Sequence, residues 1–411
     1  MYYDRNKLNF KTILLYIFII STATCPAILI WRYTFNGLLL LLMLLSPVIV
    51  LFFLLKGFRL YRYEILLLIF LLTIFFFPLL MYSESLRWST ILYSTMFCVL
   101  FMAYIRLQKH SGLTTIQYLK LLKFLIYAYF VVLLIQQFCV LTGLPIFWIN
   151  AYNPLEPWKL NSLNMEPSWS ARMVPLLMYS FITIKEITLN RRYNLKKDLK
   201  TDKYIWIAFL YTMVTMGSGT AFLFIPIVLL KFIRGRDIVV LVTLILILWF
   251  AAQQISPQTM KRTTDTFWAT LTLNENKIIE ADASAACRIV PVIILAKNVG
   301  LTTLDDWFGH GIDSTDKLLF HIMPAMGNIS VGGGIFQVWY EYGFFSFIVF
   351  VLFSFFTCYK KDDFLSVIFW FFLVFMYGVN SQTVWICIIL LYTNKFSVNK
   401  NNKQIKSNVN S

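Results

Sequence analysis

The stretch that decides the fold class is Asn36–Leu55, which reads NGLLLLLMLLSPVIVLFFLL. It carries no charged side chain, and a helix needs about 20 apolar residues to cross the hydrocarbon core of a bilayer. Working outward, similar runs occur at 12–30, 65–82, 88–105, 124–142, 169–184 and 238–256, and near 336–358. The sequence therefore predicts an all-α, polytopic integral membrane protein.

The composition of the whole chain agrees with this prediction. Of 411 residues, 59% are hydrophobic and 14% are charged, whereas roughly a quarter are charged in an ordinary soluble domain. Lys and Arg number 36 against 20 Asp and Glu, a formal net charge of +16. This excess does not indicate nucleic-acid binding, because most positive residues lie in short segments between apolar runs.

Two apolar stretches fit either one long helix or a hairpin of two short helices. Tyr204–Leu230 has Gly217-Ser218-Gly219-Thr220 at its centre, and Phe364–Tyr392 has Gly378-Val379-Asn380-Ser381-Gln382. Single helices would give about 10 spans and hairpins about 12. The dense basic group at 231–236 favours hairpins, because positive residues in short loops stay in the cytoplasm. We therefore expect about 12 spans with both termini cytoplasmic.

The expected organisation is a membrane domain over residues 1–396, with extracytoplasmic loops at 143–168 and 257–335. Residues 397–411 are predicted to be a disordered cytoplasmic tail, because they are mostly Asn, Lys and Ser. The first apolar segment has no cleavage-site pattern, so it is expected to remain as an anchor. Of six cysteines only Cys287 lies in the large outer loop, and no disulfide framework is expected there.

Several kinds of chemistry have no motif in this sequence. There is no glycine-rich phosphate loop, no Cys-x-x-Cys and no His-Glu-x-x-His, and His110, His310 and His321 are scattered. We therefore predict neither a metal nor another cofactor. The remaining candidate chemistry is polar and lies in the two outer loops.

The first outer loop ends in the polar segment Glu166-Pro167-Ser168, where a helix is predicted to begin. Pro167 is expected in the first turn, with Glu166 near the N-cap, where a carboxylate gains from the helix dipole. Glu166 could also be no more than a helix-capping acid. Arg172 falls one turn into an apolar helix, where an unpaired guanidinium costs roughly 2.5 kcal/mol or more. It needs an anionic partner, either Glu166 or a lipid-linked phosphate.

The second outer loop, 257–335, has six Lys and Arg against eight Asp and Glu. Residues 289–300 are predicted to form an amphipathic helix against the membrane, with Arg288 at its start. His310 stands between two glycines, and a surface residue is the plain alternative. Glu341 enters the next span, where an ionisable group suggests function, unless it sits in the wet interfacial belt of Trp and Tyr.

Taken in order, these pieces resemble the bacterial O-antigen polymerase and ligase group, the Wzy-type polysaccharide polymerases. The resemblance rests on the layout of about 12 spans, on a long outer loop before the tenth span and on several short motifs. These motifs are Glu166-Pro167-Ser168, Gly217-Ser218-Gly219-Thr220-Ala221, Arg288 upstream of Gly309-His310-Gly311, and Glu341-Tyr342-Gly343.

The resemblance implies polymerisation of oligosaccharide repeat units carried on undecaprenyl diphosphate, at the outer face of the bacterial cytoplasmic membrane. The products would be O-antigen, capsular or exopolysaccharide chains, and a chain-length regulator and a flippase would be partners. In that reading Arg172 and Arg288 are candidates for binding the diphosphate. Glu166, His310 and Glu341 are candidates for activating or orienting the acceptor sugar.

The sequence departs from this group in two places. Ligases of the group carry a His-Asn pair shortly before the final glycine of the last outer loop, and here Gly332-Gly333 stands in that place. This favours a repeat-unit polymerase over an O-antigen ligase and leaves the base unidentified. Thr220 follows Gly219 where an arginine is common, which puts a phosphate role for that turn in doubt.

The main rival class is a flippase or transporter for lipid-linked oligosaccharides. Transporters usually bind near the midplane and show repeated halves, and neither feature is apparent in this sequence. A multi-span lipid-phosphosugar transferase would be expected to carry acidic residues in its first outer loop, and Trp31–Asn36 contains none.

Overall fold

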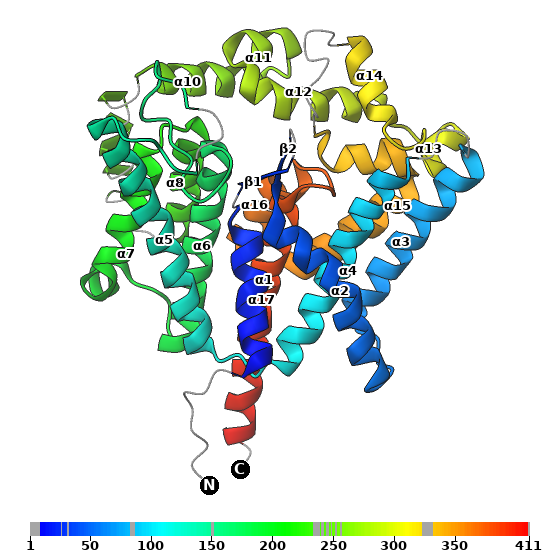
Figure 1. Ribbon diagram of the computed structural model, residues 1–411, viewed down its shortest axis with the longest axis horizontal. Helices are drawn as coiled ribbons and strands as arrows, with labels where there is room; N and C mark the ends of the chain where they lie inside the picture. The colour runs from blue at the N-terminus through cyan, green and yellow to red at the C-terminus, as the bar shows by residue number, and fades with distance from the viewer. Residues whose placement is uncertain are drawn as a thin grey trace. The chain divides into compact units, whose positions relative to one another are not determined.

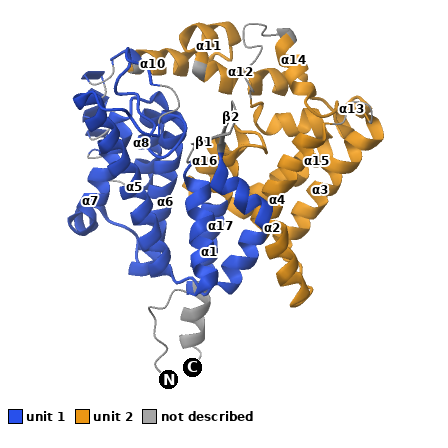
Figure 2. Ribbon diagram, viewed as in Figure 1, with its two compact units in different colours: residues 1–45, 103–259, 389–411 blue, residues 46–102, 260–388 orange. Residues whose placement is uncertain are grey.

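The computed structural model describes residues 9–25, 27–30, 33–82, 87–148, 152–232, 257–322 and 332–409, and scattered residues between 239 and 254. Their regular secondary structure is helical apart from one two-stranded hairpin (Figure 1). They fall into two compact units (Figure 2). Unit 1 holds residues 1–45, 103–259 and 389–411, and unit 2 holds 46–102 and 260–388.

Unit 1 is built from the N-terminal helix, a hairpin and the helices of the middle of the chain. Its elements are α1 (Phe10–Ala23), β1 (Ala27–Ile30), β2 (Tyr33–Asn36), α5 (Thr115–Thr142), α6 (Pro167–Leu189), α7 (Leu195–Thr215), α8 (Gly219–Leu229) and a 3₁₀ turn (Leu230–Phe232). The strands are antiparallel, with Ala27 paired to Asn36 and Ile30 to Tyr33. The helix predicted over 12–30 therefore ends at Ala23, and the chain turns back through the hairpin.

Unit 2 combines long apolar helices with a group of short amphipathic ones. Its elements are α3 (Arg62–Met81), α11 (Glu275–Ala281), α12 (Ala283–Asn298), α13 (Leu304–Phe308), α14 (Ser314–Ile322), α15 (Gly334–Cys358), α16 (Phe364–Trp370) and a π-helical turn (Phe371–Phe375). Four helices contribute residues to both units: α2 (Gly37–Leu55), α4 (Trp88–His110), α10 (Pro257–Leu271) and α17 (Gln382–Val409).

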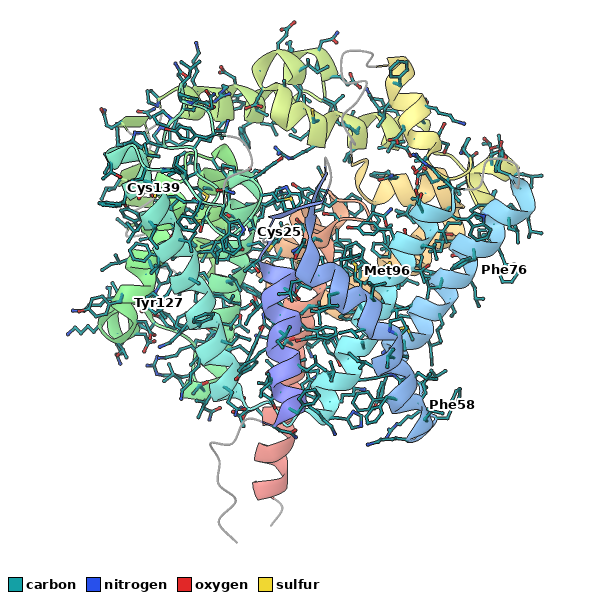
Figure 3. All side chains as sticks on the ribbon, in the orientation of Figure 1. Cys25, Phe58, Phe76, Met96, Tyr127 and Cys139 are labelled. Atoms are coloured by element: carbon teal, nitrogen blue, oxygen red, sulfur yellow. The ribbon has the colours of Figure 1, made fainter. Side chains whose placement is uncertain are left out.

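Five helices of the described chain are long and apolar enough to cross a membrane: α2, α3, α4, α5 and α15. On α3 the side chains of Ile65, Ile69, Leu72 and Phe76 are exposed, and this spacing places them on one face of the helix. Figure 3 shows Phe76 pointing away from the protein. An exposed apolar stripe on a helix of this length suits contact with lipid, so the prediction of a helical membrane protein is confirmed at this level.

Both ambiguous stretches are interrupted at their glycine-rich centres. In the first, α7 ends at Thr215 and α8 begins at Gly219, and Gly217 between them has φ +67°. In the second, the π-helical turn ends at Phe375 and α17 begins at Gln382. Neither stretch is one continuous helix, although the count of 12 spans remains a prediction. Most of the span predicted at 238–256 lies outside the described residues.

The predicted outer loop 257–335 contains a small helical core. Six buried side chains from four short helices form it: Ala269, Ile278, Ala286, Val290, Ile294 and Leu319. Asp282 caps α12 by accepting a hydrogen bond from the backbone N–H of Ala285 at 2.9 Å, so the helix starts earlier than predicted. Arg288 consequently lies in its second turn. The apolar residues of α12 pack against protein, which contradicts the prediction that this helix lies against the membrane.

The C-terminal segment also differs from expectation. Helix α17 continues to Val409, so residues 397–409 are helical where the composition predicts disorder. Its apolar first half is buried. Extending a helix that already exists gains one hydrogen bond for each residue that is ordered.

Candidate functional site

In unit 1, helix α6 begins at the predicted residues. Pro167 is the first residue of the helix and Glu166 is the N-cap, without a side-chain capping bond. The Ser168 hydroxyl donates to the Glu166 carboxylate at 3.1 Å. Arg172, only 2% exposed, donates from Nε to the Ser168 carbonyl at 2.9 Å. Ser168 thus connects the two candidate residues, and the guanidinium is held against the first turn of the helix.

The loop before α6 is held by buried amides and hydroxyls. The Gln136 side chain donates to the Asn161 side-chain oxygen at 3.0 Å, and Asn161 donates to the Trp148 carbonyl at 2.7 Å. Ser162, in the left-handed region at φ 53°, donates its hydroxyl to the Tyr129 carbonyl at 2.6 Å. This network fixes the direction in which the chain enters Glu166. The Asn-rich run at 161–164 is the sequence signal for it, but the partners on α5 could not be read from the sequence.

In unit 2 two of the sequence motifs interlock. Gly309 has φ +96°, and a Cβ at this position would overlap the Glu341 carbonyl oxygen. Gly343 has φ +83° and kinks α15, and a Cβ there would overlap the Trp307 carbonyl oxygen. Each motif therefore needs its glycine so that the other backbone can approach. Residues 309–311 and 341–343, far apart in sequence, form one structural element.

His310 is fixed by this element. Its backbone N–H donates to the Tyr340 carbonyl at 2.8 Å, and its ring lies on the Tyr340 ring with centroids 4.2 Å apart and planes 6° apart. Nδ1 lies 3.2 Å from the same carbonyl oxygen, which favours a proton on that nitrogen and leaves Nε2 as the acceptor. The histidine is half-buried and positioned, unlike a freely rotating surface residue.

Glu341 lies inside unit 2, with only 2% of its surface exposed. This excludes the alternative of an acid in the wet interfacial belt. Gln337, one turn earlier on α15, donates to its carboxylate at 3.0 Å, and the buried Thr315 of α14 is a second neighbour. A buried carboxylate with so few donors is costly in its charged form, so it is suited to taking up a proton.

Arg288 is placed by the packing of α12 against the start of α15. A Cβ on Gly334 would lie 3.1 Å from Val292, and one on Gly333 would overlap Leu295. Arg288, Val292 and Leu295 are spaced i, i+4 and i+7, so Arg288 shares the side of α12 that contacts α15. Two turns after Gly334, the same helix α15 carries Glu341.

An ion pair that the sequence did not suggest lies close to this element. Arg87 Nη1 is 3.0 Å from Asp313 Oδ2, and Thr90 donates to the same carboxylate at 3.2 Å. Asp313 lies two residues beyond Gly311, on whose backbone the Tyr82 ring packs. Burial and a hydrogen bond with Asp305 raise the pKa of Tyr82 to about 12, so this phenol stays protonated. Arg87 and Asp313 are so far apart in the sequence that no local pattern predicts their pairing.

A second charged cluster lies in unit 1, at the side of α7. The buried Asp202 carboxylate accepts from Lys185 at 3.2 Å and faces Lys123 at 3.5 Å. The Tyr193 hydroxyl donates to its other oxygen at 3.3 Å. Asp202 has non-helical backbone angles and kinks α7. This cluster has the form of a structural ion-pair network and includes none of the candidate residues.

The arrangement in unit 2 places a histidine and a buried carboxylate on two segments whose backbones are in contact. It brings together two of the three candidate acid–base residues, His310 and Glu341, and places Arg288 on a helix packed against the same span. Glu166 and Arg172 belong to unit 1. Among the residues that the structure describes, no group of three or more His, Cys, Asp or Glu side chains could hold a metal ion.

Comparisons of the chain with protein-family models, with curated proteins and with solved structures find no match.

Proposed function

We propose that this protein polymerises oligosaccharide repeat units carried on undecaprenyl diphosphate, at the outer face of the bacterial cytoplasmic membrane. The observation that carries the proposal is the interlock of Gly309–Gly311 with Glu341–Gly343. Two motifs of the polymerase-like pattern, chosen from the sequence for their order, meet at the start of an apolar helix. They hold an imidazole and a buried carboxylate there.

The proposed reaction needs one proton acceptor and one anion site. A hydroxyl of the acceptor repeat unit attacks the anomeric carbon of the donor glycan, and the bond from that carbon to the diphosphate oxygen breaks. The hydroxyl proton passes to His310 or Glu341, and the diphosphate leaves on its lipid carrier as an anion. Arg288 and Arg172 would stabilise this anion by charge-assisted hydrogen bonds. No metal or other cofactor has a step in this scheme.

The proposal includes a topology: about 12 spans, both termini in the cytoplasm, and residues 257–335 outside. Of the six cysteines, all described, five are buried and only Cys287 is partly exposed. A membrane-impermeant thiol reagent should label Cys287 in spheroplasts, and Cys287→Ser should abolish the signal. Labelling only after lysis would place the large loop inside and overturn both topology and mechanism.

The function is tested by the length distribution of the surface polysaccharide. Deletion of the protein should remove long chains and leave single repeat units on their final acceptor. Glu341→Gln keeps the shape of the side chain and should lower the polymerisation rate by about 10²–10⁴-fold. Arg288→Ala should also abolish long chains, whereas Arg262→Ala on α10 is the matched control and should leave them.

Other outcomes separate the alternatives. Loss of every surface unit, including single ones, would favour a flippase. Long chains that accumulate on the lipid carrier without transfer to a final acceptor would favour a ligase. An unchanged length distribution after deletion would refute the polymerase proposal.

A further inference from the structure

The C-terminal half of α10 has one face that no other described element covers. Phe267, Trp268 and Leu271 are 52%, 63% and 61% exposed, and Leu273, just beyond the helix, is 58% exposed. Residues spaced i, i+1 and i+4 lie on one side of a helix. The neighbouring side chains Thr266 and Ala269 are buried, and Ala269 belongs to the core with Ile278 and Ile294. The helix is therefore anchored by one side and presents large apolar groups on the other.

Sequence continuity indicates what lies against this face. Residues 238–256 form an apolar run of the length of a membrane span, and α10 begins at the next residue, Pro257. A chain that leaves the hydrocarbon at residue 256 has its following helix at the surface of the same bilayer. Trp268 lies about three helical turns beyond that point, so it is at most about 18 Å from the place where the chain leaves the lipid.

The residue types on α10 suit the same location. Trp and Phe are the side chains that occupy the boundary between head groups and acyl chains. Lys261, exposed in the first turns of α10, and the neighbouring Arg262 supply positive charge for lipid phosphates. A helix of this kind lies in the plane of the interface with its apolar side toward the acyl chains.

We propose that α10 is an interfacial helix, and that Phe267, Trp268, Leu271 and Leu273 bind the lipid surface next to the span predicted at 238–256. The sequence predicted such a helix at 289–300, but the apolar side of α12 is used for protein packing, and α10 has the free face. This inference is independent of the proposed polymerase activity. It concerns only which part of the predicted outer loop 257–335 lies at the lipid head groups.

The test is a depth measurement on the full-length protein in lipid nanodiscs. In a Cys287→Ser background, nitroxide labels are placed at Leu271→Cys and, as a control on the exposed polar side of the same helix, at Asp265→Cys. Power-saturation EPR with oxygen and with a water-soluble nickel chelate then reports lipid and water contact. The label at 271 should collide preferentially with oxygen, and the label at 265 preferentially with nickel.

Two results would overturn the proposal. Preferential nickel contact at both positions would show that the face is in water. Protection of position 271 from both reagents would show that protein covers it, either a second copy of this chain or another partner. A second label at Phe267→Cys checks that the result belongs to the face and not to one altered residue, because it should match position 271.

Discussion

Two polar regions of this protein use opposite means to shape a loop beside a helix. In unit 1, the loop before α6 is held by side chains, with Asn161 bonded to Gln136 and Trp148. In unit 2, the segment around His310 is held by backbone approach, through the missing Cβ atoms of Gly309 and Gly343. The first method uses its polar side chains for structure. The second holds its segment without the Glu341 carboxylate, which is a candidate group in the proposed reaction.

This difference separates structural polar residues from candidate chemical ones. A buried amide that makes several hydrogen bonds has no capacity left for a substrate. A buried carboxylate beside one glutamine and one threonine retains capacity to take up a proton. On this basis Asn161 is expected to matter for stability and Glu341 for turnover.

The largest effect is expected at the backbone interlock. Gly343→Ala adds a Cβ that overlaps the Trp307 carbonyl at a φ of +83°, so it should lower the free energy of unfolding by about 2–5 kcal/mol. Gly143→Ala is the matched control: its φ is +70°, but nothing lies within 4 Å of the new Cβ. It should cost only about 1–2 kcal/mol. Thermal unfolding in detergent measures both, and equal losses would show that the interlock contributes no more than local strain.

An intermediate effect is expected in the side-chain network of unit 1. Asn161→Ala leaves the Gln136 amide and the Trp148 carbonyl without their shared partner, which should cost about 1–3 kcal/mol. The polysaccharide length per folded molecule should stay unchanged. Asn153→Ala, an exposed residue with one turn hydrogen bond, is the control and should stay within about 0.5 kcal/mol of the parent. If Asn161→Ala lost the long polysaccharide chains while the free energy of unfolding stayed unchanged, Asn161 would have a chemical role. The two regions would then not differ in the way described above.

The smallest change in the free energy of unfolding is expected at Asp306 of unit 2, a carboxylate with a structural role. Burial opposes ionisation of Asp306, but hydrogen bonds from Thr303 and Thr302 outweigh it and lower the pKa. A lowered folded-state pKa means that ionised Asp306 stabilises the fold above about pH 4 and that this contribution is lost as the pH falls further. Asp306→Asn should cost about 1 kcal/mol at pH 7, the size of one helix cap.

The pH dependence checks this assignment. The difference in melting temperature between parent and Asp306→Asn should shrink as the pH falls below about 4. Asp265→Asn on α10 serves as the control for removing one charge. A difference that grows toward acid pH would contradict the capping role.

The fold class could be predicted from sequence because apolar run length is a local property. Asn36–Leu55 and Arg62–Met81 are recognisable without knowing their neighbours. Gly217 and Gly378 marked the two helix breaks for the same reason. Glu166 and Pro167 at the start of α6 were also predicted, since helix N-termini depend on adjacent residues.

The features that could not be predicted from the sequence depend on contacts between residues that are far apart in the chain. The contact of Gly309 with Glu341 and the pairing of Arg87 with Asp313 join segments that no local pattern connects. The prediction of a membrane-surface helix at 289–300 was wrong because an amphipathic pattern shows that a face is apolar, and not whether protein or lipid covers it. The buried residues Val290 and Ile294 settle this for α12.

The buried Asp202 of unit 1 has a consequence for the order of events during biogenesis. In the proposed topology, Lys123 and Lys185 act first as retention signals while the chain is inserted, and acidic residues weaken such signals little. Only after α5, α6 and α7 have packed do both lysines meet the one carboxylate. The same two charges would thus have two successive roles. They orient the chain during insertion, and in the folded protein they join helices by ion pairs with Asp202.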